Sequence, residues 1–213
     1  MKTKPPKRPI DDRLLDTAID QFGRKGLEGA STRAIAAAAE TAMSSITYHY
    51  GGKEGLHIAA ARHIAQQISG RMLTALDVPA DMVDLDPKAA IERVLAMADA
   101  FLQLMLSPES APWARFIVRE QLDPSKAFSI LWNEFMGKLS GHLVALIERA
   151  GAGRWDAQEA RIRALTIVGQ LLVFRVARAT VLRVTHWDDV GAAQAVAIRA
   201  VVHANVRAIL SSL

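Results

Sequence analysis

Apolar residues recur at helical spacing along most of this chain. The first stripe of this kind, on one face of a helix with 3.6 residues per turn, consists of Leu14, Leu15, Ala18, Ile19 and Phe22. Strand-like alternation occurs only in the word ITYHY, residues 46–50, and the pattern on both sides of it is helical. The chain is therefore predicted to be all-α, with about nine helices.

Capping and stop residues mark where these helices begin and end. Asp11 or Asp12 is predicted to cap the first helix, which ends near Gly26, and Ser31 is predicted to cap a short second helix. The third helix is expected to end at the glycine pair 51–52. The first three helices are therefore short and closely spaced.

Longer helices are predicted in the rest of the chain. Residues 77–88 hold two prolines and four aspartates and are expected to form a loop, after which Pro87 opens a helix. Asp156 with Glu159 resembles a capping box at the start of another helix. The longer helices are expected at about 53–76, 87–107, 113–122, 124–150, 156–184 and 190–210.

A half-exposed helix accounts for the strand-like word at residues 46–50. On a helix, Ile46 and Tyr50 lie four residues apart on one face, and Ile46 is the expected core anchor. The neighbouring hydroxyls, imidazole and phenol would then be free to meet phosphates and base edges. Three short helices with a tight turn before the third are typical of a helix-turn-helix DNA-binding head.

Three spaced motifs run in order through residues 14–56. They are an apolar helix ending in F-x-x-K-G, the cap and helix S-T-R-x-I-A-x-A-A, and the word I-T-Y-H-Y-G-G-K-E-G-L. Together they resemble the DNA-binding head of the TetR family of transcriptional regulators. The last word, and REQLDP at residues 119–124, are most similar to the CecR-like branch of that family.

This resemblance implies three regions in the chain. Residues 1–10 would be a disordered basic arm, 11–55 the helix-turn-helix domain, and 56–213 a helical effector-binding and dimerisation domain. A homodimer would place its two recognition helices in successive major grooves of a palindromic operator, with half-site centres about 34 to 36 Å, or a multiple of it, apart. The regulator would most simply be a repressor released by a small, mostly apolar effector.

The family pattern also indicates which residues of the head contact DNA. Those expected to hold the phosphate backbone are Thr32, Arg33, Tyr48 and Lys53, and those expected to read bases are Ser44, Ser45, Thr47 and His49. Glu40 departs from the pattern, because family members usually carry Gly in that turn. A non-Gly residue in a left-handed conformation costs about 1 kcal/mol, which leaves the shape of the turn open.

Composition and charge are compatible with this interpretation. The net charge is +4 with a pI near 9.6, and the first thirteen residues carry five basic side chains, which suits a polyanionic partner. The absence of cysteine excludes disulfides and zinc–thiolate sites and suits a reducing compartment. No apolar stretch follows the basic N-terminus, so no signal peptide is expected. The apolar segment 164–184 carries four polar or charged residues, which disfavours a membrane span, so a cytoplasmic protein is expected.

Two long apolar helices near the C-terminus are candidates for half of a four-helix dimer interface. The alternative is that both helices close the core of a monomer. The side chains expected at the interface are Gly169, Leu172, Val173, Val176, Thr180, Val196, Ala197, Ala200 and Val201.

Aromatic, methionine and polar residues within the apolar patterns are candidates for lining an effector cavity. Core packing explains the apolar ones equally well, while the polar ones either pair with one another, orient a ligand or lie at the surface. These candidates are Phe101, Met105, Trp113, Phe116, Arg119, Glu120, Trp132, Gln170, Phe174 and Arg178.

Two other classes of protein are alternatives to the regulator. A helical-bundle metalloenzyme would need two E-x-x-H motifs, and only Glu54 with His57 forms one. No two histidines have the i,i+4 spacing of a helical metal pair, and no nucleophile elbow or phosphate loop occurs. We therefore expect no enzyme, catalytic residue, metal or cofactor. An effector-independent DNA-binding or architectural protein would share the same head.

Overall fold

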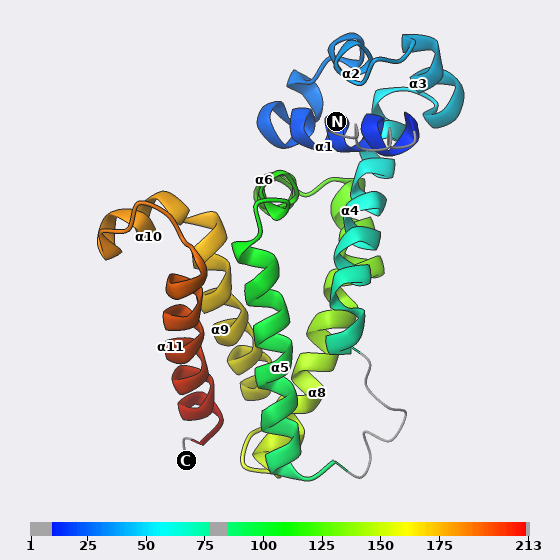
Figure 1. Cartoon of the computed structure of the whole chain (residues 1–213). Helices are drawn as coiled ribbons and strands as arrows, with labels where there is room; N and C mark the ends of the chain where they lie inside the picture. Colours follow the sequence, from blue (N-terminus) through cyan, green and yellow to red (C-terminus); the bar gives the residue numbers. More distant parts are fainter. Residues whose placement is uncertain (1–9, 77–84, 212–213) are drawn as a thin grey trace, which may run out of the picture. The chain divides into compact units, whose positions relative to one another are not determined.

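The computed structural model describes residues 10–76 and 85–211, which are helical apart from short connections (Figure 1). No β-strand occurs among these residues, so the all-α prediction is confirmed. The helices are α1 (Ile10–Gly29), α2 (Thr32–Ala38), α3 (Met43–Tyr50), α4 (Lys53–Leu76), α5 (Pro87–Leu106), α6 (Ser110–Leu122), α7 (Lys126–Leu131), a π-helical turn η2 (Trp132–Met136), α8 (Gly137–Gly151), α9 (Ala157–Val176), α10 (Arg178–Thr185) and α11 (Ala192–Ser211).

The chain divides into two compact units. The first comprises the residues up to Gln67 together with residues 112–134, and the second comprises residues 68–111 and 135–213. The N-terminal helices therefore share a unit with most of α6 and with α7, although residues 68–111 separate the two segments in sequence.

The apolar stripe of α1 forms the centre of the first unit. Leu14, Ala18, Ile19 and Phe22 are all at most 2% exposed. Helix α1 is interrupted at Gly26, whose φ of 74° lies in the left-handed region that favours glycine, so the predicted stop is found at this residue.

Helix α6 packs closely on α1 within the first unit. A Cβ at Gly23 would lie 3.1 Å from the backbone nitrogen of Phe116, so glycine permits this approach. Arg115 Nη2 lies 2.7 Å from Asp20 Oδ1, and Arg24 also donates to Asp20. Partial burial opposes ionisation of Asp20, but the hydrogen bonds and charges of these arginines lower its pKa below the usual value. The carboxylate is therefore held ionised between α1 and α6.

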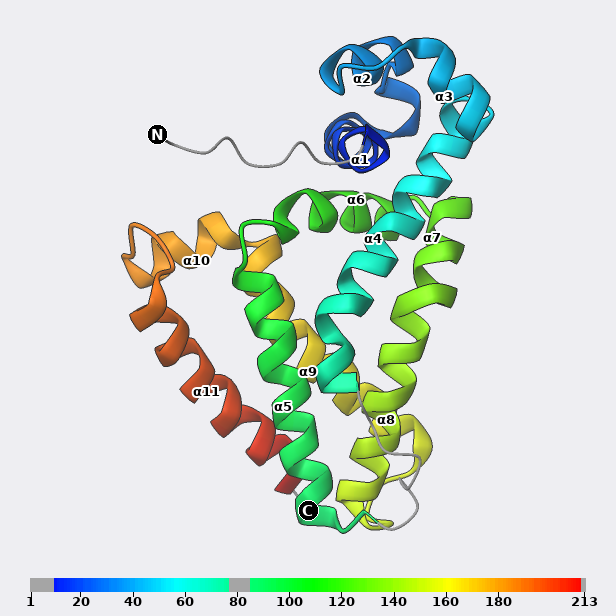
Figure 2. The same ribbon diagram turned by 45° about the vertical axis from the view of Figure 1, so that its right-hand side comes forward.

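The second unit is a helical bundle. Helix α5 packs against α8 and α9, and α11 packs against α5, α8 and α9 (Figure 2). Its core is built from the buried faces of these four helices, including Val94, Leu146, Ile167 and Val202. Asp99 on α5 joins this core to α11 by accepting from Arg199 and lying 2.7 Å from His203 Nε2.

Most predicted helix boundaries are found in the structure. Ser31 caps α2, Asp86 caps α5 with Pro87 in its first turn, and Asp156 caps α9 by accepting from the backbone nitrogen of Glu159 at 2.7 Å. Gly51 ends α3 in a left-handed conformation, as the glycine pair predicts.

The prediction of one continuous helix at residues 156–184 is wrong. The chain breaks at Ala177, and α9 and α10 form an angle of 84°. No proline or glycine marks this break, but both flanking arginines are bound outside the helix: Arg175 donates to the carbonyl of Ser107 and Arg178 to Asp189. The bend is accompanied by these tertiary contacts, which the sequence around Ala177 does not predict.

No single helix in the described part of the chain is long and apolar enough to cross a membrane. The bent pair α9 and α10 meets that test only when the two helices are taken together, and only by length and composition. Two sequence predictions fall largely outside the described residues: the basic arm at 1–10, of which only residue 10 is described, and the loop at 77–88, of which residues 77–84 are not.

Candidate DNA-binding surface

Helices α2 and α3 form the helix-turn-helix that the sequence predicts. Ser31 Oγ accepts from the backbone nitrogen of Ala34 at the start of α2, and Ile35 on the inner face of α2 is buried. In α3, Ile46 is only 1% exposed, which confirms it as the core anchor of this short helix. Because Ile46 fixes one face of α3, the opposite face is turned to solvent.

The exposed face of α3 carries the polar side chains that were predicted to meet DNA. Tyr48 is 85% exposed, and Ser44, Thr47 and His49 are exposed as well, while Ser45 is half-buried. The rings of Tyr48 and His49 meet edge to face with centroids 4.9 Å apart. The helix therefore presents hydroxyl, phenol and imidazole groups together on one surface.

Three further predicted contacts lie on the flanking helices. Thr32 and Arg33 open α2, with Thr32 half-buried and Arg33 exposed. Lys53 opens α4, and its ammonium donates to the backbone carbonyl of Glu28 at 3.3 Å and lies 3.9 Å from the carboxylate of Glu28. A phosphate at Lys53 would therefore share the ammonium with the end of α1.

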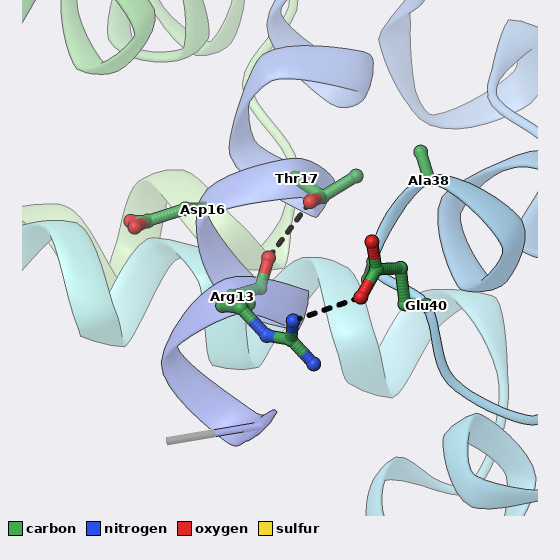
Figure 3. A pocket seen from close by; sticks show the side chains of 6 residues that line it. Arg13, Asp16, Thr17, Ala38 and Glu40 are labelled. Carbon is green, nitrogen blue, oxygen red and sulfur yellow. Dashed lines mark hydrogen bonds and ion pairs between the residues drawn. The ribbon is translucent and has the colours of Figure 1, made fainter. Parts of the chain in front are cut away.

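The turn before the recognition helix is strained at Glu40. Its φ of 53° is left-handed, so the turn keeps the conformation that glycine ordinarily serves, at a cost of about 1 kcal/mol. Glu40 Oε2 accepts from Arg13 Nη1 at 3.2 Å, and both side chains line a pocket of about 320 Å³ (Figure 3). The pair joins α1 to the turn, but exposed pairs contribute only about 0–1 kcal/mol. The stability gained does not exceed the strain.

The beginning of α1 lies beside the end of the recognition helix. Burial, together with the charges of Asp11 and Asp12, raises the pKa of Tyr50 above its ordinary value. Arg13 follows these two aspartates in the first turns of α1. The sequence pattern did not single out Arg13 as a partner of the turn, because the two residues are 27 positions apart.

A buried polar cluster lies behind the DNA-binding helices within the first unit. His57 of α4 is 4% exposed and sits between the rings of Phe22 and Phe116, with centroids at 4.7 and 4.8 Å. Its Nε2 lies 3.5 Å from the carboxylate of Glu120, which is also buried. Burial lowers the pKa of His57, and the charge of Glu120 opposes that shift.

Glu120 accepts hydrogen bonds from the first residues at the start of α7. Its Oε2 accepts from the backbone nitrogens of Ser125 and Phe128, both at 3.1 Å, and from Ser125 Oγ at 2.7 Å. Neighbouring Arg119 donates to the carbonyl of Arg24 beside the break in α1. These two residues of the REQLDP word therefore bind other elements of the first unit.

The candidates for an effector cavity are divided between the two compact units. Five lie in the first unit, and among them Phe116 and Trp113 are buried while Trp132 is exposed. The other five lie in the second unit: Phe101 and Phe174 pack against its core, Met105 is buried, and Arg178 pairs with Asp189. The Nε2 of Gln170 is buried with no hydrogen-bond partner among the described residues.

The residues predicted for dimerisation all lie in the second unit and are all exposed. On α9 the buried positions Ile167 and Leu171 face the core, as the helical projection predicted, and the candidates lie away from it. The exposed candidates are Gly169, Leu172, Val173, Val176, Thr180, Val196, Ala197, Ala200 and Val201. We call the members on α9 and α11 the apolar face of α9 and α11. Thr180 lies on α10 beyond the bend at Ala177, so it does not continue the face of α9 as the projection of one continuous helix predicted.

Known regulator families match most of this chain. Residues 14–60 match the family described as "Bacterial regulatory proteins, tetR family", and residues 90–213 match "HTH-type transcriptional dual regulator CecR, C-terminal domain". The HTH-type transcriptional dual regulator CecR of Shigella flexneri is 33% identical over 180 residues, covering 82% of this chain and 79% of that protein. This chain belongs to the TetR family of transcriptional regulators.

Other transcriptional regulators are similar at lower sequence identity. The regulatory protein RaaS of Mycobacterium tuberculosis is 29% identical over 158 residues, covering 74% of this chain and 66% of that protein. A TetR-like regulator from Rhodococcus sp. RHA1 superposes with a TM-score of 0.69 at 19% identity, covering 99% and 100% of the two chains. A TetR-family regulator from Streptomyces coelicolor gives a TM-score of 0.65 at 16% identity, covering 94% of each chain.

Membership of the TetR family makes this protein a DNA-binding transcriptional regulator. The matched families and curated relatives are regulators and not enzymes, in agreement with the sequence prediction. No group of three or more histidine or acidic side chains placed to hold a metal ion occurs in the described ranges 10–76 and 85–211.

Proposed function

We propose that this protein is a one-component regulator in which a dimer of helix-turn-helix heads binds a palindromic operator. The observation that supports it best is the recognition helix α3, which is anchored by buried Ile46 and exposes Ser44, Thr47, Tyr48 and His49. In this proposal Ser44, Ser45, Thr47 and His49 read base edges. Phosphates are held by Thr32, Arg33, Tyr48 and Lys53.

Footprinting on the promoter region of the protein's own gene tests the operator. Two protected half-sites with centres about 10 to 10.5 base pairs, or a multiple of that, apart are expected on one face of the duplex. The logarithm of affinity should fall with the logarithm of salt concentration by about 0.9 for each phosphate neutralised. Equal affinity for the promoter and for a random duplex would contradict the proposal.

The apolar face of α9 and α11 supports assembly into a homodimer. Leu172, Val173, Val196 and Val201 are between 37% and 68% exposed, and a patch of this kind on a soluble protein marks an interaction site. Nothing lies within 4 Å of a Cβ built on Gly169, so that position is open for a second helix to approach. A stable dimer of this kind buries about 2,000 Å² or more.

A charge placed in this face tests the dimer. Val201→Glu should shift the protein from dimer to monomer in sedimentation, because an unpaired carboxylate in an apolar interface is strongly unfavourable. Ser140→Glu, at an exposed position of α8, is the matched control and should leave the dimer intact. A wild-type protein that sediments as a monomer would refute the assembly.

We further infer that the body of the protein takes a small, mostly apolar effector that releases the operator. The support is the set of aromatic and methionine side chains within the apolar patterns and the buried Nε2 of Gln170, which has no hydrogen-bond partner among the described residues although Oε1 of the same amide accepts from Asn205. Release requires that the effector bind the two head spacings with different affinity. The control of target genes is proposed to be chiefly repression, exerted in the cytoplasm where the chromosome lies.

Thermal shift with a panel of small apolar compounds tests the effector. A compound that binds only the folded state raises the melting temperature in a concentration-dependent way and should weaken operator binding in the same range. A panel without any such compound, combined with intact operator binding, would favour a DNA-binding protein that needs no effector.

A further inference from the structure

We propose that Glu40 holds Arg13 as a latent phosphate contact, so that Glu40 sets the overall strength and salt dependence of DNA binding without changing sequence preference. The inference rests on the proposed operator binding and concerns the ion pair between α1 and the helix-turn-helix turn (Figure 3). Neither residue belongs to the set predicted to contact DNA.

Stability alone does not account for a glutamate at this position. Glu40 occupies a left-handed conformation that glycine adopts without strain. Its carboxylate is 72% exposed, so the ion pair with Arg13 is screened by solvent and offsets little of that strain. A role for the carboxylate outside folding therefore explains its presence better.

The contact between Glu40 and Arg13 is loose enough to be exchanged. It is a single hydrogen bond of 3.2 Å from Nη1, whereas a guanidinium can offer a two-pronged contact to an anion. Arg13 Nε is buried with no hydrogen-bond partner in the described part of the chain. The pocket of about 320 Å³ beside the pair gives the side chain room to rotate (Figure 3). A phosphate would satisfy more of the guanidinium than Glu40 does.

The position of the pair makes a phosphate contact feasible. Glu40 lies three residues before Met43, the first residue of the recognition helix. Arg13 lies in the first turns of α1 together with Asp11 and Asp12. The charges of these aspartates act on Tyr50, which is the last residue of the recognition helix α3. Both side chains therefore belong to the part of the head that carries α3, and a duplex bound by α3 brings phosphates close to them.

Release of Arg13 from Glu40 should change DNA affinity equally for all DNA sequences, because a phosphate contact does not read bases. A cation that reaches a phosphate strengthens binding to any duplex and steepens its salt dependence, because each neutralised phosphate releases counterions. Glu40 prevents this by occupying Arg13 and by adding a negative charge of its own. The regulator consequently binds more weakly than its basic residues alone would allow, which makes release from DNA easier.

The test compares Glu40→Gln with wild type on operator and on random duplexes between 50 and 200 mM salt. Glu40→Gln should raise affinity for both duplexes by a similar factor. Its log–log salt slope should be about 0.9 steeper, which corresponds to roughly threefold more loss over that fourfold range of salt. Glu40→Gly, which also relieves the left-handed strain, should give the same steeper slope.

Two further variants test whether the effect of Glu40 is exerted through Arg13 and not through net charge alone. Glu92→Gln changes the net charge equally by removing the exposed partner of Arg207 in the second unit, and it should leave the slope unchanged. Arg13→Gln should cost little in the wild-type background and should abolish the gain in the Glu40→Gln background, as a double-mutant cycle would show.

Three results would overturn the proposal. One is an unchanged slope in Glu40→Gln, and another is an equal gain in Glu92→Gln. The third is a changed ratio of operator to random affinity without a steeper slope, which would indicate that Glu40 only shapes the turn. Because the slope is measured on random DNA as well, the proposal is judged independently of whether an operator is found.

Discussion

His57 of α4 and Glu120 of α6 meet in the interior of the first unit, with Nε2 of His57 3.5 Å from Oε1 of Glu120. Both residues are 4% exposed, and they connect the helix that follows the recognition helix with the cap of α7. Neither is a predicted DNA contact. Because this polar pair is buried behind the DNA-binding helices, the stability of the first unit depends on the protonation of His57. It also depends on the hydrogen bonds that Glu120 accepts at the start of α7.

The first prediction concerns the pH dependence of stability. Burial lowers the pKa of His57, so below about pH 6.5 the unfolded chain binds the proton more readily than the folded protein does. The free energy of unfolding should therefore fall as pH drops from about 7.5 to 5.5, and His57→Gln should make that fall smaller. Urea denaturation at both pH values measures it.

An internal control accompanies this measurement. Between about pH 7.5 and 8.5 His57 is neutral in both the folded and the unfolded state, so wild type and His57→Gln should change equally. An identical loss of stability in the two proteins between pH 7.5 and 5.5 would show that His57 does not contribute.

The second prediction concerns the cap provided by Glu120. Glu120→Ala leaves the backbone nitrogen and the hydroxyl of Ser125 without their acceptor, and a buried unsatisfied donor costs about 1–3 kcal/mol. The backbone nitrogen of Phe128 keeps the carbonyl of Ser125 as an acceptor. Glu120→Gln should cost less, because its amide oxygen still accepts. Glu148→Ala, at an exposed position of α8, is the control and should stay within about 0.5 kcal/mol of wild type. Equal urea midpoints for the two alanine variants would contradict the capping role.

The third prediction concerns Gly151 at the end of α8. A Cβ there would lie 2.6 Å from the ring of Trp155, and that ring is held by Arg154 and Arg163, whose guanidinium carbons lie 4.8 and 4.1 Å from its centroid. Gly151→Ala should therefore destabilise by about 1–3 kcal/mol through overpacking.

Gly141 in the same helix provides the matched control for that variant. Nothing lies within 4 Å of its Cβ position, so Gly141→Ala should be neutral or stabilising by up to about 1 kcal/mol. The melting temperatures of both variants are compared with that of wild type. A Gly151→Ala protein as stable as wild type would show that the ring of Trp155 can move aside.

The fourth prediction concerns the anchor of the recognition helix. Ile46→Ala should cost about 2–5 kcal/mol, because Ile46 is 1% exposed and holds α3 on the head. Operator affinity should fall with it, since the base-reading face is no longer held. Met43→Ala, at a side chain 50% exposed on the same helix, should leave stability nearly unchanged. Retained operator affinity in Ile46→Ala would argue against α3 as the reading element.

Local signals in the sequence predicted the helices well and their tertiary partners poorly. The caps at Ser31 and Asp156 are found where the sequence predicts them, because a cap bonds to nitrogens only three residues away. The break between α9 and α10 was missed, since its flanking arginines bind Ser107 and Asp189.

The same distinction holds for the DNA-binding surface. The word ITYHY and the glycine pair predicted a short, half-exposed helix with Ile46 inward, because helical spacing alone decides which side chains share a face. The left-handed glutamate at the turn posed a question that the sequence left open. The structure answers it with Arg13, 27 residues away.

By itself, the sequence determined that this protein is all-α, that it carries a TetR-type head, and which face of each helix is apolar. These properties depend on interactions within a few turns of one helix. Only the tertiary structure decided that α6 belongs with the head, that Glu120 caps α7 beside His57, and that Arg13 meets Glu40. Such pairings depend on how whole helices pack, and packing brings together side chains whose separation in sequence carries no periodic signal.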